Sequence, residues 1–175
     1  PDLEQAMRAA DVPAFTVDSH RPLRAFDVIG VSLATELGYT NLLTMLDLAG
    51  IPLRSADRGE QDPLVIVGGH AAFNPEPVAD FIDGAVLGDG EEAVLAVSDV
   101  LEQAARAGWS RDETLHRLAA TAAVYVPAFY DVEYTDVEYP AVEPGAAAGS
   151  GACAIAAIRP NQPGVPWKVD KHTLM

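Results

Sequence analysis

The chain has 175 residues and a formal net charge of −15. This length fits a single domain that is large enough to bury its own hydrophobic core. The strong negative charge argues against a surface for nucleic acid or for an anionic membrane. No apolar run approaches the roughly 20 residues that are needed to cross a bilayer. The single cysteine, Cys153, excludes an internal disulfide and a cysteine-only metal site, and it agrees with a cytoplasmic location.

Amphipathic and β-rich apolar segments alternate along the first part of the chain. The run FDVIGVSL has the length and the β-branched composition of a buried strand. Thr40 and Asn41 are suitable N-cap residues for the leucine-rich segment that follows them, and Gly50 is a typical helix end. The predicted elements are a helix over 3–10, a short strand over 14–17, a strand over 26–33 and a helix from 40 to 49.

Two further apolar runs each end in a glycine turn. Residues 64–67 lead into Gly68-Gly69, and residues 85–87 lead into the turn GDGE at 88–91. Helical patterns follow both turns, and such repeated units of strand, glycine turn and helix are typical of an open parallel sheet. We therefore expect an α/β fold. Ligands of such sheets bind at the carboxyl ends of the strands, which is where these glycines lie.

The rest of the chain predicts helices and then antiparallel strands. Ser110 and Glu113 form a capping box, and Gly108 ends the helix before it. A loop rich in glycine and alanine separates two β-rich runs. The predicted elements are a helix over 75–81 capped by Asn74, helices over 91–107 and 111–120, strands over 123–133 and 153–158, a loop over 144–151 and a linker over 161–167.

The two glycine turns form the first candidate binding site. A pair of glycines permits positive φ and a close backbone approach to a ligand or to a neighbouring helix, or it simply forms a tight βα turn. The second turn leads into a helix N-terminus, whose free N–H groups attract anions and polar amides. Since the acids of that turn already bring negative charge, a neutral or amide-bearing ligand suits it better than a phosphate. The candidate residues of the two turns are Gly68, Gly69, Gly88, Asp89, Gly90 and Glu91.

Three polar side chains stand close to these predicted strand ends in the sequence. Ser32 lies at the end of the first predicted strand, and its hydroxyl can bond either a ligand or its own turn. Asn41 lies at the start of the following helix and can line the same crevice. His70 follows Gly69 directly. Because no second histidine or cysteine stands at metal-ligand spacing, we expect a hydrogen-bonded histidine there and no metal.

The sequence contains no recognisable catalytic set. It lacks a Gly-x-Ser-x-Gly elbow, a P-loop and a Gly-x-Gly-x-x-Gly fingerprint. The acids around the glycine turns are predicted to cap helices and to form a solvated face, and not to act as paired acid–base carboxylates. These acids are Asp80, Asp83, Asp89, Glu91 and Glu92. No residue of this chain is predicted to be catalytic.

Three blocks of the sequence resemble a known family of proteins. They are residues 26–58, residues 63–94 with the strings FNPEP and GDGEE, and residues 165–175 with the string VPWKVDKHTLM. The blocks resemble the region ahead of the radical core in a bacterial family of radical S-adenosylmethionine (SAM) proteins that have an N-terminal cobalamin-binding-like domain. The resemblance covers residues 1–135 and 163–175, and it leaves the segment between them unmatched.

The resemblance implies a Rossmann-like or flavodoxin-like open parallel sheet in three αβα layers, with a small antiparallel β appendage toward the C-terminus. In related cobalamin-binding domains, a serine motif and a Gly-Gly turn hold the nucleotide tail of the corrin. The matching positions are Ser32-Leu33, Gly68-Gly69 and 88–91, with Asn41 and His70 as outer candidates. The Asp-x-His-x-x-Gly motif of an axial histidine is absent from the sequence. The three-cysteine motif is absent as well, so the 4Fe-4S cluster and S-adenosylmethionine belong to the full-length protein.

The resemblance also implies a division of the chain. We expect a cobalamin-binding-like domain over 1–121 without its first βα unit, a β extension over 122–160 with a flexible insertion at 136–152, and a linker over 161–175. The chain begins without an initiator Met, and we expect an internal piece of a longer protein whose radical SAM domain is its partner in cis. Capping that active site and presenting cobalamin to it is the expected function. The alternatives are a vestigial lid module without a cofactor and a stand-alone flavodoxin-like protein that binds flavin.

Overall fold

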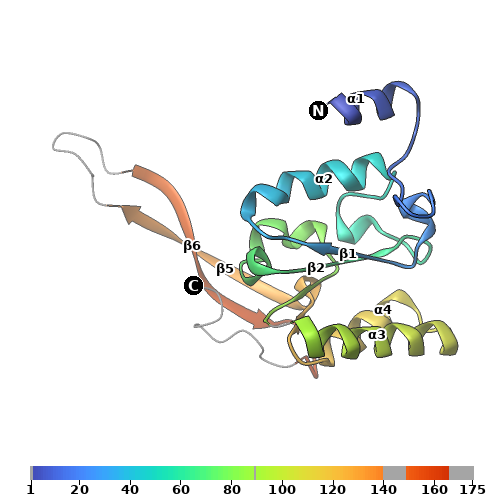
Figure 1. Cartoon of the computed structure of the whole chain (residues 1–175). Coiled ribbons are helices and arrows are strands. Elements are labelled where there is room, and N and C mark those ends of the chain that lie inside the picture. The colour runs from blue at the N-terminus through green and yellow to red at the C-terminus, as the bar shows by residue number, and fades with distance from the viewer. Residues whose placement is uncertain (1, 89, 140–148, 166–175) are drawn as a thin grey trace.

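The computed structural model describes residues 2–88, 90–139 and 149–165. Its centre is a four-stranded sheet in the order β1-β2-β3-β4 (Figure 1). Strands β1 (Val28–Ser32), β2 (Leu64–Gly68) and β3 (Gly84–Val86) run parallel, and β4 (Val124–Tyr125) pairs antiparallel with β3. The predicted open and mostly parallel sheet of an α/β fold is confirmed.

The inner strand β2 is more deeply buried than the outer strand β1. All four residues of the LVIV segment in β2 are buried, as expected of a parallel strand that is covered on both faces. Strand β1 is buried at Ile29 but exposed at Gly30 and Ser32. The register aligns Ser32 with Gly68, so the two strands end at the same level. The carboxyl edge of the sheet is therefore built as the sequence predicts.

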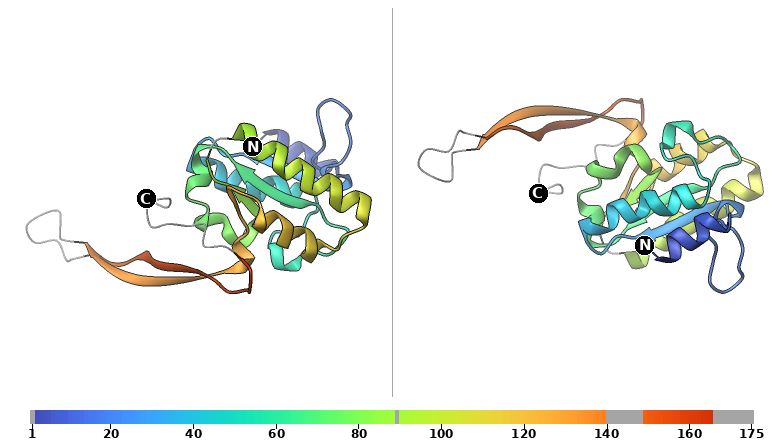
Figure 2. Two further views of the ribbon diagram at one scale, coloured as in Figure 1. Left: turned by 90° about the horizontal axis from the view of Figure 1, so that it is seen from below. Right: turned by 90° about the horizontal axis from the view of Figure 1, so that it is seen from above.

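Helices cover both faces of the sheet. Helix α2 (Tyr39–Leu48) lies on one face, and helices α3 (Gly90–Ala107) and α4 (Arg111–Ala120) lie on the other (Figure 1, Figure 2). Their buried side chains form the core together with the strands. They are Leu42 and Leu46 of α2, Ala93 and Val97 of α3, and Leu118 and Ala119 of α4. None of the described helices has the length and the apolar composition that a membrane span requires.

The segment before β1 contributes little regular structure. Helix α1 (Asp2–Ala9) lies outside α2, and an ion pair of 2.6 Å joins Arg8 to Asp47 of that helix. The short strand predicted at 14–17 is wrong, because only a single bridge between Phe15 and Pro22 forms there. Further 3₁₀ turns lie at Leu23–Ala25, Glu36–Gly38, Ser55–Asp57, His70–Phe73 and Pro127–Phe129.

Two predicted helix caps are wrong. Helix α2 begins at Tyr39, directly after a 3₁₀ turn, so Thr40 and Asn41 lie inside its first turn. The 3₁₀ turn already continues into the helix, which removes the need for a capping side chain. The segment predicted as a helix over 75–81 is a 3₁₀ helix, Glu76–Phe81, without a side-chain cap from Asn74. The two prolines at its start favour this short, tight form over an α-helix.

The single strand predicted over 123–133 is also wrong, since the structure divides it. Strand β4 joins the main sheet, a 3₁₀ turn follows at Pro127–Phe129, and β5 (Tyr130–Tyr139) starts a second sheet. Proline lacks the N–H that a continuing ladder would need, so the chain turns at this point. Strand β5 pairs antiparallel with β6 (Gly149–Pro160), which confirms the small antiparallel appendage.

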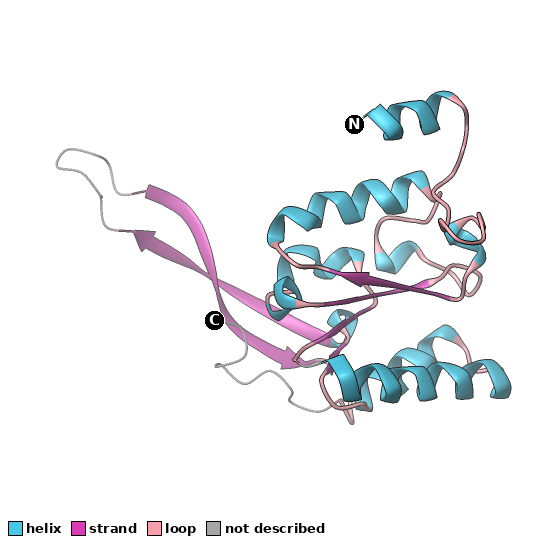
Figure 3. Ribbon diagram, viewed as in Figure 1, coloured by secondary structure: helices cyan, strands magenta, loops and turns pink. Residues whose placement is uncertain are grey.

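The β5–β6 hairpin projects away from the sheet and its helices (Figure 2, Figure 3). Its strands extend into the predicted flexible insertion from both sides, as far as Tyr139 and from Gly149 onward. Residues 144–148 of the predicted loop over 144–151 lie outside the described residues, as do residues 166 and 167 of the predicted linker, whereas 149–151 belong to β6 and not to a loop. The antiparallel pairing thus starts at the domain and continues well beyond it.

Candidate functional site

The carboxyl ends of β1 and β2 meet as predicted. Ser32 and Gly68 are Cα partners in the parallel register. The Leu33 N–H donates to the Gly68 carbonyl at 2.8 Å, which extends the ladder one residue beyond the strands. Strand β3 ends beside them, and Val86 lies 3.8 Å from the position of a Cβ on Gly68. The structure therefore brings Ser32 and the first glycine turn together at one edge.

Gly69 is required by the packing of the chain on itself. Its φ of +92° lies in the region that favours glycine, and a Cβ there would stand 2.9 Å from the Leu33 carbonyl oxygen and 3.2 Å from Ser32 Oγ. The same carbonyl accepts a hydrogen bond from Ala71 N at 2.9 Å. The close neighbour of Gly69 is thus the backbone at the end of β1 and not a helix, which agrees with a tight βα turn. The Leu33 side chain is buried in the core, so only its backbone reaches the edge.

The second glycine turn is more open. Gly88 has a φ of +109°, and a Cβ on Gly88 or on Gly90 would meet no atom within 4 Å. Gly90 is the first residue of α3, and Glu91 and Glu92 are exposed in its first turn. Asp89 lies outside the described residues. This turn can accept a group that approaches the backbone closely, and its carboxylates favour a neutral or amide-bearing group over an anion.

The outer candidates Asn41 and His70 are exposed. Asn41 stands in the first turn of α2, and no hydrogen bond of the described residues joins it to either glycine turn. The His70 ring lies edge-on to Phe73, with 6.2 Å between the ring centroids. No group of three histidine, cysteine or acidic side chains able to hold a metal exists in the described part of the chain. The structure leaves these two residues at the periphery of the edge.

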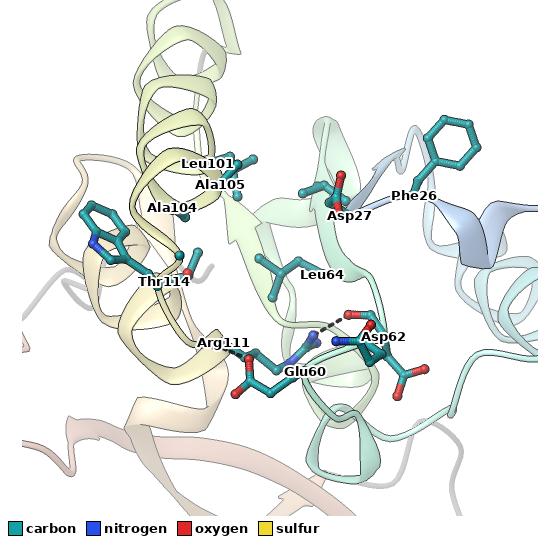
Figure 4. A pocket seen from close by; sticks show the side chains of 14 residues that line it. Phe26, Asp27, Glu60, Asp62, Leu64, Leu101, Ala104, Ala105, Arg111 and Thr114 are labelled. Carbon is teal, nitrogen blue, oxygen red and sulfur yellow. Dashed lines mark hydrogen bonds between the residues drawn. The ribbon is translucent and has the colours of Figure 1, made fainter.

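A cavity of about 580 Å³ lies at the opposite, amino end of the strands. Figure 4 shows Leu101 and Ala105 of α3 across from Asp27 and Leu64. Small side chains on α3 leave the space between helix and sheet unfilled. Arg111 is the only cation among the described residues that line this cavity, and it is already engaged in the cluster described next. The cavity therefore does not suit an anionic ligand.

A buried ionic cluster lies at the start of β3, where Asp83 accepts from two arginines. Arg58 and Arg111 each donate to a different carboxylate oxygen at 2.7 Å. The side chain of Asp83 is 2% exposed, so its predicted place on a solvated face is wrong. Val65 N donates to the same carboxylate at 2.7 Å, and Asp83 N donates to the Val65 carbonyl at 2.8 Å. Asp83 thereby joins β2, β3 and α4.

The Arg58 side chain has no exposure, and each of the three nitrogens of its guanidinium donates at least one hydrogen bond. Besides Asp83, it donates to the carbonyls of Pro52, Leu53 and Phe81 at 2.7 to 3.0 Å. Burial lowers the pKa of this guanidinium, and the Asp83 carboxylate opposes that effect. Full satisfaction of a buried ion pair is typical of a structural role, so we assign this cluster to folding and not to chemistry.

A second polar pair links Glu76 of the FNPEP string to β4. The Tyr125 hydroxyl donates to Glu76 Oε1 at 2.6 Å. Tyr125 is 1% exposed, and burial raises the pKa of its hydroxyl above the ordinary value. Burial also raises the pKa of Glu76, while the hydrogen bond from Tyr125 acts in the opposite direction. This pair borders a cavity of about 530 Å³ at the base of the hairpin.

No local pattern predicts these two clusters. Asp83 and its two arginines lie 25 and 28 residues apart in the chain, and Glu76 and Tyr125 lie 49 apart. One weak signal exists for Asp83, since it stands between Ile82 and the apolar start of β3. A charged residue inside an apolar run indicates a buried partner but does not identify it.

The fold and the edge define a class of protein, an α/β domain with helices on both faces of its sheet and glycine turns at the carboxyl ends of the strands. The comparison with protein families identifies the family. The family described as "Radical SAM proteins, N-terminal" matches residues 1–127. The chain therefore belongs to this family and is the N-terminal domain of a radical SAM protein. No curated protein matches the chain, and no solved structure does.

Proposed function

We propose that this domain covers the active site of a radical SAM domain in the same protein, and that its carboxyl edge receives the nucleotide tail of a cobalamin cofactor. The observation that carries the proposal is the alignment of Ser32 with Gly68 at the same level, beside the open turn at Gly88. Family membership supports the catalytic domain in cis. The edge is also where ligands of doubly wound sheets bind.

The residues of this edge fit such a tail in part. Ser32 is an exposed residue, and Gly88 and Gly90 leave open space for close approach. Gly69 instead shapes the turn against Leu33, and Asn41 and His70 remain outer candidates. Cobalamin supplies radical chemistry when it is bound. The residues here would bind and orient its tail, and we assign none of them a role in bond cleavage.

The iron–sulfur cluster of radical SAM proteins does not fit this chain. Such clusters are held by several cysteine thiolates, and Cys153 is the only cysteine in the sequence. The cluster and S-adenosylmethionine therefore belong to the rest of the full-length protein. No step of their chemistry is assigned to residues of this domain.

We further propose that residues 1–121 form the cobalamin-binding-like unit, with β4 from the following segment closing its sheet. Residues 122–160 would form the β extension with its insertion at 136–152, and residues 161–175 the linker toward the catalytic domain. Strand β1 is one of the two edge strands of the described sheet, and β4 is the other. A further βα unit ahead of Pro1 would pair with the free edge of β1.

The test is a titration of the full-length protein with hydroxocobalamin, followed in the visible spectrum. The variant Gly90→Leu fills the open space at the second turn, and Gly59→Leu is the matched control because its surroundings are equally open. We expect a spectral change in the wild type and the control, and at least about tenfold weaker binding in Gly90→Leu. Copurified flavin would instead favour a flavin-binding protein.

A lid without a cofactor is the second candidate function. It is favoured by the close contact between Gly69 and the Leu33 carbonyl, which explains the Gly-Gly turn without any ligand. In that case hydroxocobalamin would leave the spectrum of the folded full-length protein unchanged. The lid would then act through its contacts with the catalytic domain alone.

A further inference from the structure

We propose that the cavity at the base of the hairpin is a binding site for an alkylammonium group. It lies between the 3₁₀ helix Glu76–Phe81 and the segment that leads from β4 into β5, and its volume is about 530 Å³. The proposed corrin edge uses none of its residues. The site is therefore independent of the proposed function.

Aromatic rings form much of the cavity wall. Tyr125 and Tyr130 are both buried, and their ring centroids lie 4.8 Å apart at an angle of 45°. Tyr134 on β5 and Phe81 at the end of the 3₁₀ helix also line the space. The faces of aromatic rings carry negative potential and attract cations within about 6 Å. A wall of this kind suits the methyl or methylene groups that surround a charged nitrogen.

One carboxylate supplies the matching charge. Glu76 lines the cavity, and the hydrogen bonds among the described residues occupy only one of its two oxygens. None of the salt bridges of the described residues involves Glu76. Burial raises its pKa, because the charged form lacks solvation there. An ammonium group beside the second oxygen would supply the missing counter-charge.

The other charges of the cavity balance each other. Arg54 donates to Asp80 at 2.7 Å, and both side chains are more than half exposed. The arginine is thereby paired at the mouth, and Glu76 carries the remaining charge among the described residues that line the cavity. A phosphate or carboxylate ligand would meet this charge, and the described lining residues offer no further cation to offset it. The chemistry of the cavity therefore selects a cation.

The structure offers one simpler explanation for the pair. The bond from Tyr125 to Glu76 also holds the 3₁₀ helix against β4, and it would do so in the absence of any ligand. A ligand site differs from this purely structural bond in one measurable way. It discriminates a positive charge from a neutral group of the same shape.

The test is isothermal titration calorimetry of the full chain with choline and with 3,3-dimethylbutan-1-ol, its uncharged isostere. We expect choline to bind at least about tenfold more tightly than the alcohol. Nα-acetyl-lysine amide, which keeps its charged side-chain ammonium, is titrated as a third compound. Tighter binding of this compound than of choline would indicate a lysine side chain of a protein as the natural ligand, and the reverse would indicate a small amine. Equal binding of choline and the alcohol, or binding of none of the three, would overturn the proposal.

Choline binding by two variants then tests whether the ligand lies beside Glu76. Glu76→Gln keeps the shape and an oxygen that accepts from Tyr125, so the fold should survive while choline binding falls at least about tenfold. Glu60→Gln removes a carboxylate that lines the cavity at the amino end of the strands and not this one, and it should leave choline binding unchanged. Circular dichroism confirms that each variant is folded. Unchanged choline affinity in folded Glu76→Gln would also refute the site.

Discussion

The carboxyl edge of the sheet and the amino end of β3 differ in how they are encoded. Ser32, Gly68 and Gly69 form the edge from two short, continuous stretches, each with its own apolar run and turn. Asp83 at the start of β3 depends on Arg58 and Arg111, which come from separate segments. The edge is therefore visible in local pattern, whereas the ionic cluster exists only after the chain has folded. Breaking the two regions should give effects of different size.

The largest effect is expected at the ionic cluster. Asp83→Asn removes the charge between two arginines that have little or no access to water, and it should lower the free energy of unfolding by about 3–5 kcal/mol. Urea denaturation measures this change. Asp80→Asn is the matched control, because its ion pair is exposed and should contribute less than about 1 kcal/mol. Equal losses in both variants would show that burial of the cluster does not determine its contribution.

Substitutions at the glycine turns of the carboxyl edge should lower the stability less, and by different amounts at the two turns. Gly69→Ala forces a side chain into positive φ and against the Leu33 carbonyl, so we expect a loss of about 1–3 kcal/mol. Gly90→Ala meets open space at the start of a helix and should stay within about 0.5 kcal/mol of the wild type. Thermal unfolding of the two variants separates these outcomes. A costly Gly90→Ala would mean that the second turn is also shaped by the chain itself.

A smaller, pH-dependent effect is expected at Glu76. Burial raises its pKa in the folded state, so its contribution to stability is complete below the unfolded pKa and is lost as the pH rises through the folded pKa. Glu76→Gln removes this loss and still accepts from Tyr125. The variant should therefore gain stability relative to the wild type as the pH rises above 4.5, the ordinary pKa of the group, as measured by urea denaturation at several pH values. A difference that does not change with pH would contradict the raised pKa.

The smallest effect concerns the contact between α4 and the end of the hairpin. The His116 ring stacks on Phe129 at 4.4 Å and bonds the Asp112 carbonyl and the Gln162 side chain. The bond to the Asp112 carbonyl is the main cause that raises the pKa of His116, and Gln162 adds to it. This stabilisation is present below the unfolded pKa and fades as the pH rises through the folded one. An NMR titration should show a pKa above 6.5 for His116 and a lower value in Gln162→Ala; an unchanged value would exclude Gln162 as a partner.

Much of the fold follows from local sequence, for physical reasons that a short stretch can satisfy alone. The apolar runs of β1, β2 and β3 and the glycine turns after them predict the parallel sheet. The predicted Ser110 cap is confirmed by its bond from Glu113 N at 3.1 Å, which closes within one helical turn. The glycine pair is similarly visible, since positive φ restricts the residue type at Gly69.

Tertiary structure decided the features that depend on contacts between segments far apart in the sequence. The break between β4 and β5, the burial of Asp83 and the pairing of Glu76 with Tyr125 all depend on which segments meet after folding. The local sequence around a charged residue does not show whether its side chain faces water or a buried arginine, because its solvation is set by neighbours that are remote in the chain. The sequence by itself thus determined the three parallel strands, the glycine turns after them and the radical SAM family of this protein. Only the folded chain determined which of its polar side chains are structural and which ones face a cavity.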